Sequence, residues 1–457
     1  MLELRSLTGS ISCLLLAAAA LAACGQAPEQ PADAASRDAA KPVVITLDEA
    51  IRRAQQSDPS YAASSAESAV SALDRSIARG SLLPSAVYHN QALYTQPNGL
   101  LNQAGQGAAA QPAPRFIANN AVREYASQAS INDTLGVAGW AGVRRADAAS
   151  ALAAAQLEVS RRGLVAAVTG MFYGSVAADH KITVAELARK EAADFTKLTG
   201  EREQARESAH ADVVKAQLVE QQRQRDLEDA KVAAEKARLE LGVLLFPDPR
   251  TPYTLQAPGD APPLASREDV EQAAARNNPE LKSALAALGV SNADVLSARA
   301  AYLPDLGLNV TYGIDAPQIA ENGPGKVRNL GYSANVTLDI PVWDWLSTEH
   351  KVKQSEIRRD AAQVALSAAQ RQLIARLDEA YSEAETARDQ LTSLDASVAT
   401  AEESLKLTKL RYTGGEASVL EVVDAQSAFV LAENAREDGR VRYEAARVDL
   451  RTLTGTM

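Results

Sequence analysis

The chain has 457 residues, a net charge of −11 at pH 7 and only 4% aromatic residues. A negative charge without a basic patch argues against a nucleic-acid-binding protein. Alanine, glutamine, glutamate, leucine and arginine are plentiful, a composition that suits long helices better than sheets.

The N-terminus has the pattern of a bacterial export signal. Residues 1–23 predict a signal peptide, because Arg5 supplies positive charge and the apolar run 11–21 is too short to span a membrane. The sequence Leu21-Ala22-Ala23-Cys24 resembles the lipobox of bacterial lipoproteins, which implies lipidation of Cys24. Gly25, in place of the aspartate that marks inner-membrane retention in lipoproteins, favours the outer membrane. The alternative is an ordinary secretory signal with an unmodified cysteine.

The residues after the signal are mostly small or polar and include prolines. Residues 24–42 are therefore interpreted as a lipidated flexible tether. Cys13 lies within the signal peptide and Cys24 is the predicted lipid site, so the mature chain keeps no free thiol. A disulfide, a cysteine-ligated zinc site and a cysteine nucleophile are therefore excluded.

Two later stretches carry the same local plan. In the first, Pro59 and Pro84 lie 25 residues apart, and in the second Pro279 and Pro304 have the same separation. This period is far longer than that of solenoid repeats. We predict two tandem repeats, 43–245 and 266–457, separated by a proline-rich connector at 246–265.

Four segments alternate apolar and polar residues with period two. They lie near 85–95 and 125–137 in the first repeat, and near 305–313 and 331–340 in the second. Strands with one apolar face are typical of a membrane barrel with a wet lumen, although a soluble sandwich hairpin would also alternate. Four strands do not close a barrel, and open edges are not tolerated in lipid. We therefore expect three copies to contribute twelve strands.

Two proline-free stretches predict long helical hairpins, at about 139–245 and about 344–455. Their apolar residues recur at intervals of three and four, as in Leu391, Leu394 and Val398, with charged flanks. This pattern is typical of helices that pack against other long helices.

Gly414 and Gly415 interrupt the second helical pattern, as a hairpin turn requires, and Ser418 is placed to cap the following helix. The matching segment of the first repeat, 206–217, lacks the tyrosine and both glycines. The turn of the first hairpin is therefore less sharply defined by sequence.

The stretch 411–426, RYTGGEASVLEVVDAQ, resembles the TolC family of outer membrane efflux proteins, whose lipidated members are outer membrane factors. The paired Leu-Pro positions and residues 340–345 are similar to the family as well, and the likeness covers nearly the whole mature chain. The resemblance implies a mainly α fold with a small transmembrane β-barrel portion. In it, a trimeric 12-stranded β-barrel in the outer membrane continues into a long coiled-coil α-barrel in the periplasm.

The resemblance also implies partners and site residues. A homotrimer in outer-membrane lipid would meet a periplasmic adaptor, a membrane fusion protein, and an inner-membrane pump. The adaptor-docking tip would comprise Tyr412, Gly414, Gly415 and Ser418. Glu421 and Asp424 share one helix face and match the positions at which the family places the acids of the pore constriction. The alternative for this pair is a solvated acidic face.

We find no sign of catalysis in the sequence. The four histidines have no metal-ligand spacing, and no nucleophile elbow, phosphate loop or Rossmann fingerprint is present. We therefore predict no catalytic residue, cofactor or metal. The predicted function is a passive exit duct for small molecules in a tripartite efflux system. The alternatives are a type I protein secretion duct of the same fold and a lipid-anchored periplasmic coiled-coil scaffold without a pore.

Overall fold

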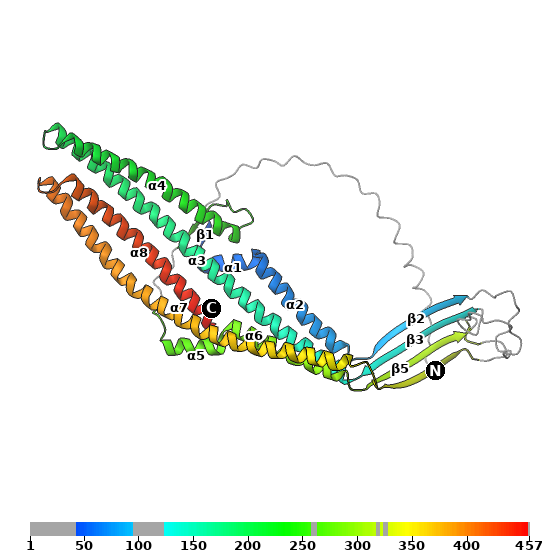
Figure 1. Ribbon diagram of the computed structural model, residues 1–457. Helices are drawn as coiled ribbons and strands as arrows, with labels where there is room; N and C mark the ends of the chain where they lie inside the picture. Colours follow the sequence, from blue (N-terminus) through cyan, green and yellow to red (C-terminus); the bar gives the residue numbers. More distant parts are fainter. Residues whose placement is uncertain (1–42, 95–122, 257–262, 317–319, 323–327, 456–457) are drawn as a thin grey trace, which may run out of the picture. The chain divides into compact units, whose positions relative to one another are not determined.

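A computed structural model describes residues 43–94, 123–256, 263–316, 320–322 and 328–455 (Figure 1). The predicted signal peptide, Cys24, the tether and most of the segment between the first two predicted strands lie outside these ranges. The arrangement below concerns the unit that begins at Val44.

The same order of two short helices, two strands and two long helices occurs twice along the chain. The first set is α1 (Leu47–Ser57), α2 (Pro59–Gly80), β2 (Ser85–Tyr94), β3 (Arg123–Leu135), α3 (Val137–Gln204) and α4 (His210–Leu245). The second is α5 (Arg267–Asn277), α6 (Pro279–Ala300), β5 (Asp305–Ala316), β6 (Leu330–Asp339), α7 (Ser347–Thr413) and α8 (Val419–Thr454). Two short strands, β1 (Val43–Ile45) and β4 (Tyr253–Leu255), pair with each other. The predicted mainly helical fold with a small sheet is confirmed.

The short helices are separated by the same device in both sets. The Asp58 carboxylate accepts a hydrogen bond from the Tyr61 amide at 2.6 Å, and the Asn278 side chain accepts one from Leu281 at 2.8 Å. Each cap is followed by a proline at the first helical position, where its missing amide costs nothing. Asp-Pro and Asn-Pro thus end one helix and begin the next.

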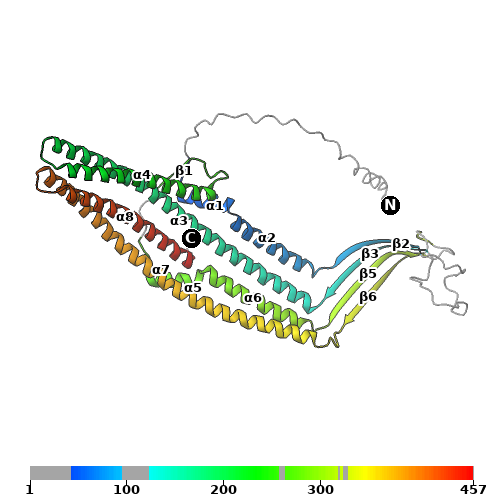
Figure 2. The same ribbon diagram turned by 45° about the horizontal axis from the view of Figure 1, so that its top comes forward.

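The long helices form two hairpins, α3 with α4 and α7 with α8 (Figures 1 and 2). α3 has 68 residues, which corresponds to roughly 100 Å of helix. It also contacts α2, α6 and α8, so it joins the two repeats. Its Phe172 is fully buried with Ile45 and Leu241 in one of the hydrophobic clusters. None of the described helices combines the length and apolar content needed to cross a bilayer.

The four longer strands form one antiparallel sheet in the order β2-β3-β5-β6 (Figure 2). The central pair, β3 with β5, joins the two repeats, and Ile131 lies opposite Val310. β2 and β6 are the two edges of the sheet. Each edge presents unpaired backbone groups that a further strand can pair with.

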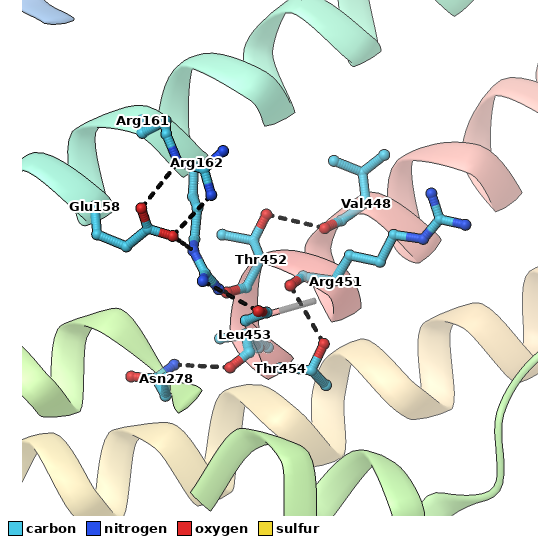
Figure 3. Close-up of polar contacts among 10 residues, drawn as sticks. Glu158, Arg161, Arg162, Asn278, Val448, Arg451, Thr452, Leu453 and Thr454 are labelled. Atoms are coloured by element: carbon cyan, nitrogen blue, oxygen red, sulfur yellow. Dashed lines mark hydrogen bonds and ion pairs between the residues drawn. The ribbon is translucent and has the colours of Figure 1, made fainter. Parts of the chain in front are cut away.

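A polar cluster fixes the end of α8 against α3 and the start of α6 (Figure 3). The Arg162 side chain is buried, with 7% exposed, and donates to the Thr452 carbonyl at 3.4 Å and the Gly455 carbonyl at 3.1 Å. Asn278 donates to the Leu453 carbonyl at 3.1 Å. These bonds satisfy carbonyls that a helix end leaves without intrahelical partners.

Glu158 balances the buried guanidinium of this cluster. Its carboxylate accepts from Arg161 at 2.8 and 2.9 Å and from Arg162 at 2.5 Å. The hydrogen bond from Arg161 is the main cause that lowers the pKa of Glu158 to about 2, against an opposing effect of burial. At neutral pH the cluster therefore contains an ionised carboxylate between two arginines.

Candidate functional site

The turn between α7 and α8 forms at the two glycines that the sequence singled out. α7 ends at Thr413, and Gly415 has a φ of +80°, in the left-handed region that favours glycine. The Gly414 amide donates to the Leu410 carbonyl at 3.0 Å, and the Glu416 amide donates to Arg411 at 2.9 Å. The hairpin thus reverses within five residues, 414–418.

Ser418 and Glu421 form a reciprocal cap at the start of α8. The Ser418 hydroxyl accepts from the Glu421 amide at 3.3 Å, and the Glu421 carboxylate accepts from the Ser418 amide at 3.1 Å. This arrangement is a capping box. The bond from the Ser418 amide is the first cause that lowers the pKa of Glu421, and Arg411, 3.4 Å away, adds to it. Glu421 is therefore ionised and is held by its own chain.

Asp424 lies three residues beyond Glu421 on α8, and both side chains are exposed. The two predicted constriction residues thus lie beside the hairpin turn and share a helix face. Their orientation towards a channel axis stays a prediction.

The predicted docking residues divide into exposed and buried members. Gly414, Gly415 and Ser418 are exposed, whereas Tyr412 is only 5% exposed. The Tyr412 ring contacts Phe195 of α3 at 5.0 Å between centroids, and its hydroxyl donates to Thr199 at 3.3 Å. The Tyr412 side chain thus packs between the hairpins, and its place in the docking tip stays a prediction.

Arg202, which no sequence pattern singled out, joins the two turns. Its guanidinium lies 4.9 Å from the centre of the Tyr412 ring and donates to the Tyr412 carbonyl. It also lies 3.5 Å from Glu207 in the turn between α3 and α4. An isolated arginine within a helical sequence pattern gives no indication that its side chain will contact another hairpin.

The first hairpin turns without glycine. α3 ends at Gln204 and α4 begins at His210, and Arg206 adopts the left-handed conformation with a φ of 63°. The Glu207 amide donates to the Arg202 carbonyl at 2.8 Å. A non-glycine residue at positive φ is uncommon. The position of this turn was therefore harder to predict from the sequence than that of the glycine-containing turn.

The β5-β6 half of the sheet has one apolar and one polar face, whereas on the β2-β3 half the apolar side also carries Ser127 bonded to Tyr88 and Asn90. The register places Leu308, Val310 and Tyr312 of β5 beside Val336, Ala334 and Tyr332 of β6 on one face. The other face carries hydrogen bonds between polar side chains: Gln128 donates to Asp315 at 3.2 Å, and Asn309 donates to Asn132. A wall of this kind suits lipid on one side and water on the other.

Comparison with known proteins shows a family similarity in the second repeat. Residues 270–456 match the family model described as outer membrane efflux protein. This part of the chain, from α5 to α8, is therefore similar to that family.

Curated relatives match the chain over part of their length. Outer membrane protein OprJ of Pseudomonas aeruginosa is 30% identical over 178 residues, which is 39% of this chain and 37% of OprJ. Protein CyaE of Bordetella pertussis is 29% identical over 59% of this chain and 57% of CyaE. Outer membrane protein TolC of Vibrio cholerae is 24% identical over 42% of this chain and 44% of that protein. The matched parts thus span less than two thirds of these relatives.

Solved structures share the fold over most of their length. The outer membrane protein VceC of Vibrio cholerae has a TM-score of 0.75 and 15% identity, covering 90% of this chain and 96% of VceC. The Campylobacter jejuni CmeC outer membrane channel has a TM-score of 0.74 and 16% identity, covering 90% and 85%. The chain therefore has the fold of these proteins.

Proposed function

We propose that this chain forms the outer-membrane channel of a tripartite efflux system, a passive exit duct for small molecules. The observation that carries the proposal is a four-stranded sheet, apolar on one face and polar on the other along β5 and β6, joined directly to two long helical hairpins. The family match and the shared fold with the CmeC outer membrane channel support it. A coiled-coil scaffold without a pore has no need of such a sheet.

Closure of the channel wall requires more than one copy. The sheet ends at β2 and β6, and lipid does not tolerate open strand edges. In the proposed homotrimer, β6 of one copy pairs with β2 of the next, which gives a closed wall of twelve strands. Chemical crosslinking of the purified protein in detergent is expected to show three chains. A monomer that leaves the membrane on carbonate washing would contradict the proposal.

The constriction is proposed to lie near the turn of α7 and α8. In a trimer, Glu421 and Asp424 of three chains would bring six carboxylates to one axis. Such a ring attracts cations and repels anions. We propose that this ring makes the channel cation-selective at its periplasmic end.

The test is the double variant Glu421→Gln with Asp424→Asn, reconstituted in planar bilayers. Glutamine also serves in a capping box, so the start of α8 is retained while the charge is removed. We expect a loss of cation selectivity that shrinks in 1 M salt, where the screening length is about 3 Å. The matched control is Glu416→Gln, an exposed acid in the same turn. A double variant with the selectivity of the parent would place the two acids on a solvated face.

The remaining parts of the proposal concern attachment and partners. The exposed end of the turn, with Gly414, Gly415 and Ser418, is proposed to dock a periplasmic adaptor that links the channel to an inner-membrane pump. Exposed turns on rigid scaffolds are common recognition sites. Cys24 is proposed to carry lipid that anchors the tether in the outer membrane. Cys24→Ala is expected to abolish palmitate labelling and to leave the oligomer intact.

A further inference from the structure

Three potential metal ligands from different repeats converge between α3 and α8. His180 lies on α3, and Glu433 and Glu437 lie one turn apart on α8. One ligand atom from each residue lies within 4.8 Å of the other two. These residues lie far apart in the sequence, so their spacing gave no indication of a metal site. The sequence analysis therefore predicted none.

The imidazole of His180 faces the carboxylate of Glu437 across the contact between α3 and α8. Its Nδ1 lies 3.6 Å from Oε1 of Glu437. This nitrogen is shielded from solvent and has no hydrogen-bond partner among the described residues. A neutral imidazole nitrogen that is not protonated carries a lone pair, as does the carboxylate oxygen. Two such atoms repel each other unless a proton or a cation lies between them.

The spacing suits a metal ion. Zinc binds imidazole nitrogen and carboxylate oxygen at about 2.0–2.2 Å in tetrahedral geometry, so neighbouring ligand atoms lie roughly 3.4 Å apart. The 3.6 Å between His180 and Glu437 is close to that separation. A small movement of the Glu433 side chain brings the third ligand into range.

The surroundings are charged and only partly buried, with 40% of the His180 side chain and 14% of the Glu433 side chain exposed. Glu437 is 4% exposed. Arg436 lies 2.6 Å from Glu433 and 3.2 Å from Glu437, and Arg440 lies 3.7 Å from Glu437. Arg436 thus pairs with both ligand carboxylates. Metal entry requires Arg436 to swing away, which its long and partly exposed side chain permits.

We propose that His180, Glu433 and Glu437 bind a divalent transition metal such as Zn²⁺, with solvent in the remaining position. One imidazole and two carboxylates suit Zn²⁺ or Co²⁺ rather than Cu(I), which prefers sulfur ligands. The metal would connect α3 of the first repeat to α8 of the second. The proposal is independent of the exit-duct function, and it replaces the sequence prediction of no metal.

The test is calorimetric titration of ZnCl₂ into the purified full-length protein in detergent, with Co²⁺ absorption as a second readout. We expect one equivalent per chain at pH 7.5. Loss of a residue that only orients a metal ligand typically weakens metal binding by roughly 10–100-fold. His180→Ala and Glu437→Gln remove ligands themselves, so we expect each to weaken zinc binding by more than that.

The matched control is His210→Ala. His210 also faces one glutamate, Glu203, at 2.8 Å, on the exposed surface, and its loss is expected to leave the titration unchanged. Substitution of the buried Glu437 could disturb folding, so Glu433→Gln, at a less buried ligand, provides a second variant. Gel filtration checks the fold of each variant. No zinc binding by the parent would overturn the proposal. Equal binding by the parent and the His180→Ala variant would overturn it as well.

Discussion

Replacement of Arg162 by methionine tests the cluster that holds the end of α8. Methionine keeps most of the side-chain length and removes the charge and the donors. The variant loses the bonds to the Thr452 and Gly455 carbonyls, of which the second, at 3.1 Å, is the better formed. Glu158 keeps the two hydrogen bonds from Arg161, so it is not left without a partner.

The expected magnitude follows from these losses. A hydrogen bond to a charged group contributes about 1.5–3 kcal/mol to stability, so we expect local stability at the end of α8 to fall by about 2 kcal/mol. Because 1.4 kcal/mol corresponds to a tenfold change, opening of the last turn becomes roughly thirty-fold more frequent. The effect is local, because the hairpin core of α7 and α8 is unchanged.

Hydrogen exchange measured by mass spectrometry on the intact oligomer follows this opening. Peptides from the end of α8 are expected to exchange faster, while peptides across the turn at 411–420 keep their rates. The control is Arg145→Met on the same helix, where an exposed ion pair with Asp294 contributes about 0–1 kcal/mol. Unchanged protection at the end of α8, or an equal increase along the whole chain, would refute the assigned role of Arg162.

Three further outcomes are expected. The pKa of Glu158 is lowered from 4.5 to about 2, so protection at the end of α8 should be constant above about pH 4.5 and fall as the pH drops towards 2. Gly313→Val should reduce the yield of heat-modifiable oligomer, because a Cβ there would lie 2.5 Å from the Gln128 backbone, whereas Gly331→Ala has open space and should be tolerated. Gly415→Leu should weaken crosslinking to an adaptor because of the positive φ, whereas Gly414→Ala, with a φ of −75°, should not. Equal crosslinking by both glycine variants would argue against docking at this turn.

The elements of the fold lie close to where the sequence predicted them. Strands predicted near 85–95 and 331–340 are observed at Ser85–Tyr94 and Leu330–Asp339. The positions of helices and strands are encoded locally in the sequence. The local signals here are the period-two alternation, the proline-free stretches and the paired Asp-Pro and Asn-Pro caps. The division into two domain-like repeats remains a prediction, although the element order occurs twice.

The contacts between helices could not be predicted from the sequence. Tyr412 belongs to a conspicuous motif, which suggested exposure, yet it packs on Phe195 of the other hairpin. Arg202 and the group around His180 depend on how α3 lies against α7 and α8. Such contacts are set by tertiary packing between residues far apart in the chain, for which a single sequence offers no spacing rule.

The pairing of β3 with β5 has a consequence for how the protein is made. Leu306 follows its partner Leu135 by 171 positions, so the centre of the sheet forms only after a long segment of chain has been secreted. The entropy of closing so long a loop is lost before the pairing stabilises the structure. Until then, each strand pair exposes an additional edge, which favours aggregation in incompletely folded chains. Packing of α6 on α3 in the folded chain holds the helices that lead into β5 and out of β3 side by side. We therefore expect export of a chain truncated before β5 to depend strongly on periplasmic chaperones.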